Sequence, residues 1–264
     1  MSKPRNYQTE AVIIKKTKLG EAGRILTLYT PHLGKIQAVA KGVRRPRSKM
    51  AGHLELLTHS QVSLARGRNL DTVTGSQTIT SFLPLKSDLW LTSYALYATE
   101  LVGQFTADQI ENYPLFQLLL ETMHRLCQAS DNELALRYFE LHLLNEVGYR
   151  PQLQHCVSCH SSLEPATSSF SPSAGGVLCP NCSQSQPLTY PLSLNALKGL
   201  RILQASDYDA VTELEMNPEL SHELEEVMRH YLRYLLEREV KSAAWLDSLR
   251  EQVKEATPGQ IALL

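Results

Sequence analysis

The chain has 264 residues and a nearly balanced charge, with 26 Lys or Arg against 27 Asp or Glu. Its 43% hydrophobic and 20% charged residues are typical of a soluble globular protein. No apolar run approaches eighteen residues, which argues against a membrane span, and the N-terminal segment lacks the apolar core of a signal peptide. We therefore expect a cytoplasmic protein, whose cysteine thiols stay reduced.

Basic residues are concentrated in the first third of the chain. Residues 1–82 hold fourteen Lys or Arg and four Asp or Glu, so the remainder holds twelve basic and 23 acidic residues. This asymmetry predicts one domain that binds a polyanion and another that does not. The alternative is that opposite charges only help the two parts to dock.

Short segments rich in β-branched residues predict about five strands in the first 82 residues. The expected strands are 11–14, 24–30, 35–40, 61–65 and 72–79, with a hairpin loop at 66–69. Five short strands suit a small closed or half-closed barrel, and we favour an OB-fold, whose face and loops are free to bind an oligonucleotide. An SH3-like barrel remains the alternative.

A dense basic segment, Lys41–Lys49, lies between the third and fourth expected strands. Gly42 and Pro46 break regular structure there, so we predict a flexible loop that follows a phosphate backbone. The predicted first-tier contacts are Lys41, Arg44, Arg45, Arg47 and Lys49, and the second tier is Arg24, Lys35, Arg66 and Arg68. The alternative is a solvated loop that is basic only for solubility.

From Leu85 onward the apolar residues recur at helical spacing. The expected helices are 89–102, 114–126, one from a capping box at 130–133 to near Gly148, 192–203, 220–240 and a short one near 245–249. Gly103 is expected to weaken or end the first helix, and 256–264 to be disordered. The predicted organisation is α+β, with a barrel domain at 1–82 and a helical domain at 83–264. A zinc element at about 152–187 interrupts the helical domain.

Four cysteines form two C-x-x-C pairs. Nineteen residues separate Cys156-Val-Ser-Cys159 from Cys179-Pro-Asn-Cys182, a spacing that predicts one structural zinc ion bound by four thiolates. The alternatives are a redox pair or two disulfides. A redox pair usually opens a helix after a strand, whereas we place Cys179 in a loop. His155, His160 and Cys127 are expected not to be ligands.

No motif for catalysis is readable, and we predict no catalytic residues and no enzyme activity. Phosphate-binding, dinucleotide-binding, nucleophile-elbow and zinc-protease motifs are absent from the sequence. A catalytic zinc needs an open ligand position, and the His-x-Glu of a deaminase does not precede Cys179. The alternatives to a nucleic-acid-binding protein are a zinc-dependent nuclease or deaminase, and a protein–protein adaptor whose basic loop meets an acidic partner.

Several segments together resemble the RecO family of bacterial DNA repair proteins. They are Ala11–Ile14, Gly20–Thr30, Gly34–Lys35, Ala40–Lys49 and Gly148–Pro151, the last followed by the cysteine pairs. The resemblance covers nearly the whole chain and implies an N-terminal OB-fold, a helical domain and an inserted zinc element.

The same resemblance implies a function in recombination. It implies a mediator that binds single- and double-stranded DNA and anneals complementary strands. With the partner RecR, such a mediator helps to load the RecA recombinase onto DNA covered by single-strand-binding protein. It also implies contact with the acidic C-terminal tail of that binding protein, mainly through the helical domain, and location at the nucleoid when DNA is bound.

Overall fold

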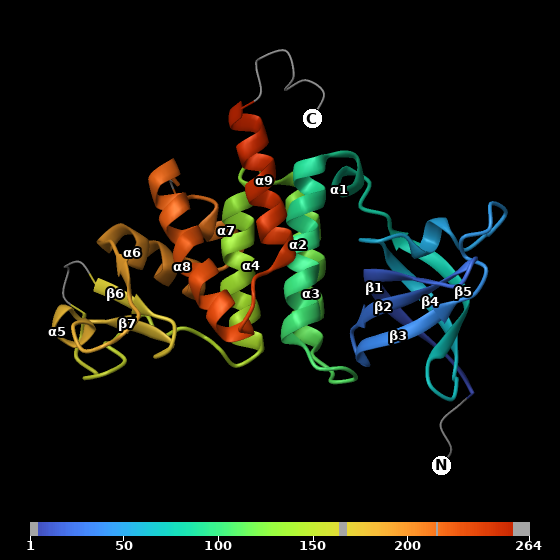
Figure 1. Cartoon of the computed structure of the whole chain (residues 1–264), viewed down its shortest axis with the longest axis horizontal. Coiled ribbons are helices and arrows are strands. Elements are labelled where there is room, and N and C mark those ends of the chain that lie inside the picture. The colour runs from blue at the N-terminus through green and yellow to red at the C-terminus, as the bar shows by residue number, and fades with distance from the viewer. Residues whose placement is uncertain (1–4, 164–167, 215, 256–264) are drawn as a thin grey trace. The chain divides into compact units, whose positions relative to one another are not determined.

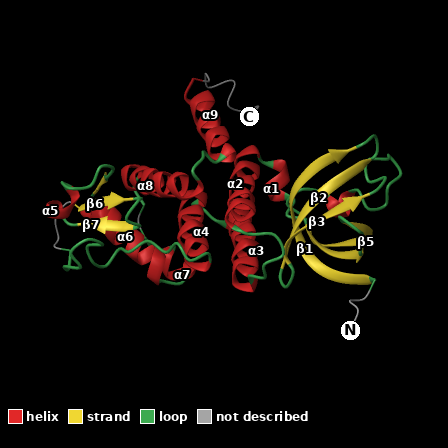
Figure 2. Cartoon of the chain, turned by 60° about the horizontal axis from the view of Figure 1, so that its bottom comes forward, coloured by secondary structure: helices red, strands yellow, loops and turns green. Residues whose placement is uncertain are grey.

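The computed structural model describes residues 5–163, 168–214 and 216–255 (Figures 1 and 2). The chain forms two compact units. We call residues 5–128 together with 241–255 the barrel unit. Residues 129–240 form the cysteine unit. The chain therefore leaves the barrel unit after residue 128 and returns to it at residue 241.

Five strands at the start of the barrel unit close into a barrel (Figure 1). They are β1 (Asn6–Leu19), β2 (Gly23–Thr30), β3 (Gly34–Ala40), β4 (His59–Ala65) and β5 (Asp71–Thr80). Their order is β1-β2-β3-β5-β4, and only the closing β3–β5 pair is parallel. The predicted five-stranded OB-type barrel is thus confirmed.

β1 is longer than predicted because it pairs with two strands. Its first half pairs with β4 and its second half with β2, and Val12 has partners on both sides. A register shift between Ile13 and Lys15 lets the strand bend from one partner to the other.

The barrel core follows the alternation of the strands. Fully buried side chains point inward from β1, β2 and β4: Ala11, Ile13, Leu26, Leu28, Val62 and Leu64. Val43 and Leu54 join this core from the β3–β4 connection, where the short helix η1 (Gly52–Leu54) lies. Burying such a side chain contributes about 1.5–3 kcal/mol, so the connection is part of the core.

Four helices complete the barrel unit. They are α1 (Pro84–Ser87), α2 (Leu89–Phe105), α3 (Tyr113–Gln128) and α9 (Lys241–Glu255). α2 continues for two residues past Gly103, so this glycine does not end the helix, and a Cβ there would meet only the Ile14 side chain, at 3.6 Å. α9 is longer than the short helix predicted. None of the helices in the described ranges is long and apolar enough to cross a membrane.

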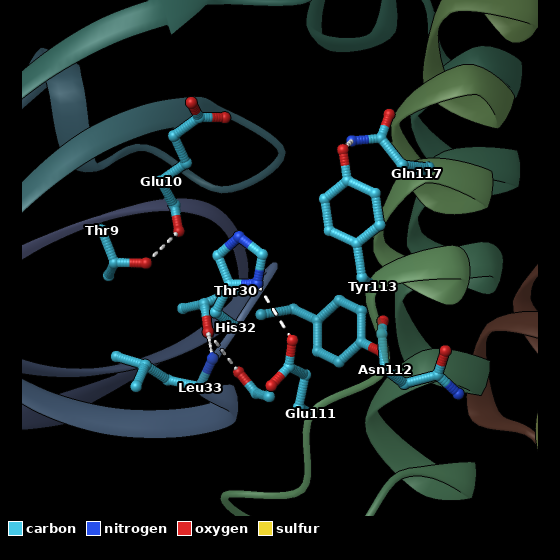
Figure 3. Close-up of polar contacts among 11 residues, drawn as sticks. Thr9, Glu10, Thr30, His32, Leu33, Glu111, Asn112, Tyr113 and Gln117 are labelled. Atoms are coloured by element: carbon cyan, nitrogen blue, oxygen red, sulfur yellow. Dashed lines mark hydrogen bonds and ion pairs between the residues drawn. The ribbon is translucent and has the colours of Figure 1, made fainter.

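Within the barrel unit, the β2–β3 turn faces the start of α3 (Figure 3). His32 contacts Glu111 at 3.0 Å and stacks on Tyr113, with ring centroids 5.4 Å apart. Gly34 has a φ of +62°, and a Cβ at that position would lie 2.0 Å from the Ile110 carbonyl oxygen. Glycine is therefore required where the barrel meets the 106–112 segment.

The cysteine unit combines helices with a small sheet. Its elements are α4 (Asn132–Glu146), β6 (Ser168–Ser171), β7 (Gly176–Leu178), α5 (Pro180–Ser183), β8 (Tyr190–Leu192), α6 (Leu194–Ala205), α7 (Tyr208–Val211) and α8 (Pro218–Leu236). Three strands in the order β7-β6-β8 form the sheet. The N-cap of α4 is Asp131, whose carboxylate accepts from the Leu134 N–H, so the predicted capping box lies one residue too early.

The mixed α+β class predicted from the sequence is confirmed, with a ring of strands followed by helices and a four-cysteine cluster. The tail predicted to be disordered, residues 256–264, lies outside the described residues.

Candidate functional site

The β3–β4 connection presents the five first-tier cations on the surface. Lys41, Arg44, Arg45, Arg47 and Lys49 are all exposed, whereas Val43 between them is only 6% exposed. Successive turns order the segment: Arg45 N–H donates to the Gly42 carbonyl at 3.1 Å and Ser48 N–H to the Arg45 carbonyl at 3.0 Å. The loop thus contains a defined series of turns, and its predicted flexibility stays a prediction.

The same loop is attached to the β1–β2 turn. The Arg44 N–H donates to the Ala22 carbonyl at 3.0 Å, and the Arg44 guanidinium lies 3.4 Å from the Gly20 carbonyl oxygen. The loop cations are therefore placed beside the end of the first hairpin.

Strand register adds two cations to this surface. Arg24 pairs with Ala40 on one side, just before the loop, and with Lys18 on the other. Lys18 is exposed and sequence reasoning missed it. The register of the 17–25 hairpin could have indicated it, because directly opposite residues share a face. We call Lys18, Arg24 and the five loop cations the basic surface.

Arg66 and Arg68 are exposed on a different hairpin, between β4 and β5. This hairpin follows Ala65, which pairs with Asn6 at the start of β1, whereas Lys18 lies near the end of β1. The structure therefore does not bring Arg66 and Arg68 into the basic surface.

Asp71 holds the β4–β5 hairpin in shape. Its carboxylate accepts from the Gly67 N–H at 3.0 Å and from the Tyr7 hydroxyl at 2.5 Å. Gly67 itself cannot carry a side chain, because a Cβ would lie 2.0 Å from the Leu70 carbonyl oxygen. Burial and the hydrogen bond to Asp71 raise the pKa of Tyr7, so its hydroxyl keeps the donated proton.

Lys35 has a different environment from the other predicted contacts. Its ammonium donates to the carbonyls of Gly103 at 2.7 Å and Thr106 at 2.6 Å, and lies 3.4 Å from the Asp108 carboxylate. A cation at the C-terminal end of α2 is favourable, since the last carbonyls of a helix lack partners. Lys35 also sits at the opposite end of β3 from Lys41.

The four cysteines of the cysteine unit converge. Their sulfur atoms all lie within 4.8 Å of one another, and the Cys159 and Cys179 sulfurs are 3.8 Å apart. Zn–S bonds of about 2.3 Å in a tetrahedron place sulfurs about 3.8 Å apart. All four are free thiols. The chain thus has a four-cysteine cluster that could bind a metal, with the donor set that zinc prefers.

Local structure prepares these sulfurs for a cation. The Cys179 N–H lies 3.4 Å from the Cys156 sulfur. Hydrogen bonds from Ser161 lower the pKa of Cys159 to about 6. A hydrogen bond from Ser158 lowers the pKa of Cys182, but hydrogen bonding with Cys179 and the other thiols outweighs it and raises that pKa to about 12. A bound cation would remove this conflict by stabilising every thiolate.

The second cysteine pair is not in the loop we predicted. Cys179 follows β7 directly and is the N-cap of α5, a single helical turn. This context resembles that of a redox pair, so the convergence of four sulfurs, and not the local context, favours the metal. His155 and His160 are exposed and lie outside the ligand cluster, and burial raises the pKa of the more distant Cys127.

Comparisons with known proteins match the same family along nearly the whole chain. Family models described as recombination protein O N terminal and C terminal match residues 1–82 and 86–244. A DNA repair protein RecO of Dehalococcoides mccartyi (strain CBDB1) is 48% identical over 250 residues, which cover 95% of this chain and 98% of the relative. RecO of Roseiflexus sp. (strain RS-1) is 43% identical over 257 residues, covering 97% and 90%. RecO of Symbiobacterium thermophilum is 35% identical over 247 residues, covering 92% and 98%.

Proposed function

Because the chain belongs to the RecO family, whose members are recombination mediators in DNA repair and not enzymes, we propose that it binds single- and double-stranded DNA through its barrel unit. The observation that carries the proposal is the set of five exposed cations on a loop anchored by Val43. Cations that neutralise phosphates release condensed counterions, which drives binding without sequence preference.

Annealing of complementary strands follows from the same chemistry. Two single strands repel each other, and a surface that screens their phosphates lets them approach and pair. No covalent step is needed. We assign the first-tier contacts to Lys41, Arg44, Arg45, Arg47 and Lys49, with Arg24, Arg66 and Arg68 as a second tier. Lys35 enters the proposal as a structural residue, since its ammonium is bonded to α2.

Family membership supports the partners that we propose. With RecR, the chain would load RecA onto DNA covered by single-strand-binding protein, in the cytoplasm at the nucleoid. Contact with the acidic tail of that binding protein would recruit it, through the helical part that follows the barrel.

We further propose that Cys156, Cys159, Cys179 and Cys182 bind one structural zinc ion. Four thiolates complete a tetrahedron and leave no open position for a substrate. The ion would hold the two cysteine pairs together, as the 3.8 Å sulfur–sulfur distance supports.

Replacement of the five loop cations by Ala tests DNA binding. Each lost phosphate contact should reduce the slope of log affinity against log salt by about 0.9 on duplex and about 0.7 on single strands. We expect a slope reduced by about 4.5 on duplex, in a fluorescence anisotropy titration at several salt concentrations. A control variant replaces four exposed cations of the cysteine unit with Ala, namely Arg150, Lys198, Arg233 and Arg238.

Equal slopes for the wild type and the five-residue variant would contradict the proposal. Absence of DNA binding by the wild type would instead favour an adaptor that binds an acidic protein. Zinc-dependent cleavage or deamination of the DNA would favour an enzyme.

A further inference from the structure

The guanidinium of Arg66 lies over an aromatic ring. Its central carbon is 4.6 Å from the centroid of the Tyr7 ring, within the range of a cation–π contact. Arg66 is exposed and Tyr7 partly buried, so the pair presents a flat, cationic surface at the edge of the barrel.

Hydrogen bonds hold the Tyr7 ring and the backbone of Arg66 in place. The Tyr7 hydroxyl donates to the Asp71 carboxylate at 2.5 Å, and the same carboxylate accepts from Gly67, next to Arg66. The Arg66 N–H donates to the Arg5 carbonyl at 2.8 Å. Asp71 in turn pairs with Ala38 where β5 and β3 close the barrel. A ring held in this way loses little entropy when planar groups stack on it, and the Arg66 guanidinium already lies over it.

Arg66 differs from Arg68 in this respect, although the two are separated by a single residue. Both are exposed on the same hairpin. Among the cation–π contacts of the described residues, the Tyr7 ring contacts Arg66 and not Arg68. Charge alone would make the two residues equivalent for a phosphate. A flat guanidinium fixed on a ring suits an unpaired nucleobase, because bases stack on aromatic rings and on guanidinium planes.

We propose that the Arg66–Tyr7 pair is a stacking site for an unpaired nucleobase. The site is distinct from the basic surface, which would bind phosphates of either single or paired strands. In a duplex the bases are already stacked on their neighbours, so the pair would strengthen binding of single strands alone. The inference rests on the proposed DNA binding and adds to it a site that recognises bases.

Arg66→Lys tests the site because it keeps the charge and removes the plane. The affinities to be measured, by fluorescence anisotropy at one salt concentration, are for an oligo-dT, a blunt duplex and an abasic single strand of the same length as the oligo-dT. We expect Arg66→Lys to weaken binding of oligo-dT about fivefold or more, since a stacked base contributes about 1–3 kcal/mol. Binding of the duplex and of the abasic strand should not change.

Arg68→Lys is the matched comparison on the same hairpin, and any change in affinity that it causes should be equal on the three ligands, because it alters a phosphate contact and not a stacked pair. Tyr7→Phe keeps the ring but loses the bond to Asp71, and should weaken oligo-dT binding less than Arg66→Lys does. Thermal unfolding of each variant confirms that it is folded.

Two results would overturn the inference while the proposed function stands. One is an unchanged oligo-dT affinity for Arg66→Lys, and the other is an equal loss on all three ligands. Failure of the wild type to bind any of the three would instead overturn the proposed function itself.

Discussion

The basic loop and the cysteine cluster place the side chains of their proposed roles in opposite directions. The loop at 41–49 turns one apolar residue, Val43, into the barrel core and leaves its cations exposed. The cysteine cluster turns four sulfur atoms toward one another, within 4.8 Å. In the loop, the residue that anchors the segment differs from the residues proposed to bind DNA. In the cluster, the same four cysteines would both bind the metal and hold the segment together. Removal of function should therefore change binding in one unit and folding in the other.

The largest expected effect is that of removing the proposed zinc ion on the cysteine unit. A structural zinc contributes about 10 kcal/mol or more to the folding of small peptides, so chelation or Cys159→Ser should increase proteolysis within 129–240. DNA affinity should persist, because the basic surface lies in the barrel unit. Zinc release, protease sensitivity and anisotropy check this prediction.

Cys127→Ser is the control for the cysteine variant, since this thiol is outside the cluster. The proposed separation would fail if chelation abolished DNA binding while the cysteine unit stayed protected from protease.

Lys35→Met tests whether a cation of the barrel can serve structure instead of binding. The change leaves the carbonyls of Gly103 and Thr106 without their ammonium donor, and we expect a loss of about 2–3 kcal/mol in unfolding free energy. The only two tryptophans, Trp90 and Trp245, both lie in the barrel unit. Urea unfolding followed by tryptophan fluorescence therefore measures the stability of this unit.

Lys41→Met is the matched variant on the exposed loop. It should keep the stability and reduce the salt slope on duplex DNA by about 0.9. The opposite pattern, with Lys35→Met reducing the slope at full stability, would return Lys35 to the DNA contacts.

Val43→Ala separates the anchor of the loop from its charges. Loss of two buried methyl groups should cost about 1–2 kcal/mol and loosen the loop, with a modest fall in DNA affinity. Arg45→Ala should show the reverse, a fall in affinity with stability within about 0.5 kcal/mol of the wild type. Urea unfolding and anisotropy on both proteins measure the two effects. Equal stabilities of Val43→Ala and the wild type would show that Val43 does not anchor the loop.

The smallest expected effect is a pH dependence of the barrel unit through His59. Burial lowers the pKa of this histidine, although the nearby Glu10 carboxylate opposes the shift. A lowered pKa means that the unfolded chain takes up the proton first, so stability is complete above about pH 6.5 and falls as the pH drops below it. His59→Gln should flatten this part of the pH profile of tryptophan-monitored unfolding. An unchanged profile would assign the titration to other groups.

The sequence predicted what depends on local patterns. Alternating residues placed four of the five strands within a few residues of their bounds. The C-x-x-C spacing indicated the cluster because each pair brings two sulfur atoms together within four residues. It could not predict contacts that depend on the closed fold. Lys35 is basic and near the loop in sequence, but its partners are Gly103 and Thr106, some seventy residues later.

Two other differences have the same cause. Lys18 joins the basic surface only through its register opposite Arg24. Val43 anchors a loop that Gly42 and Pro46 marked as irregular, and an irregular backbone can still place a side chain in the core. Such features require the register and the core, which a single sequence does not contain.

The return of α9 to the barrel unit has a consequence for synthesis on the ribosome. Glu100 in α2 accepts hydrogen bonds from the backbone N–H groups of Lys241 and Ser242 and from the Ser242 hydroxyl, and these residues begin α9. Residues 129–240 leave the ribosome before α9 does. The cysteine unit is therefore fully synthesised before the barrel unit, although its synthesis starts later. The barrel unit, begun first, is completed last, and the face of α2 that packs on α9 stays open until the final helix emerges.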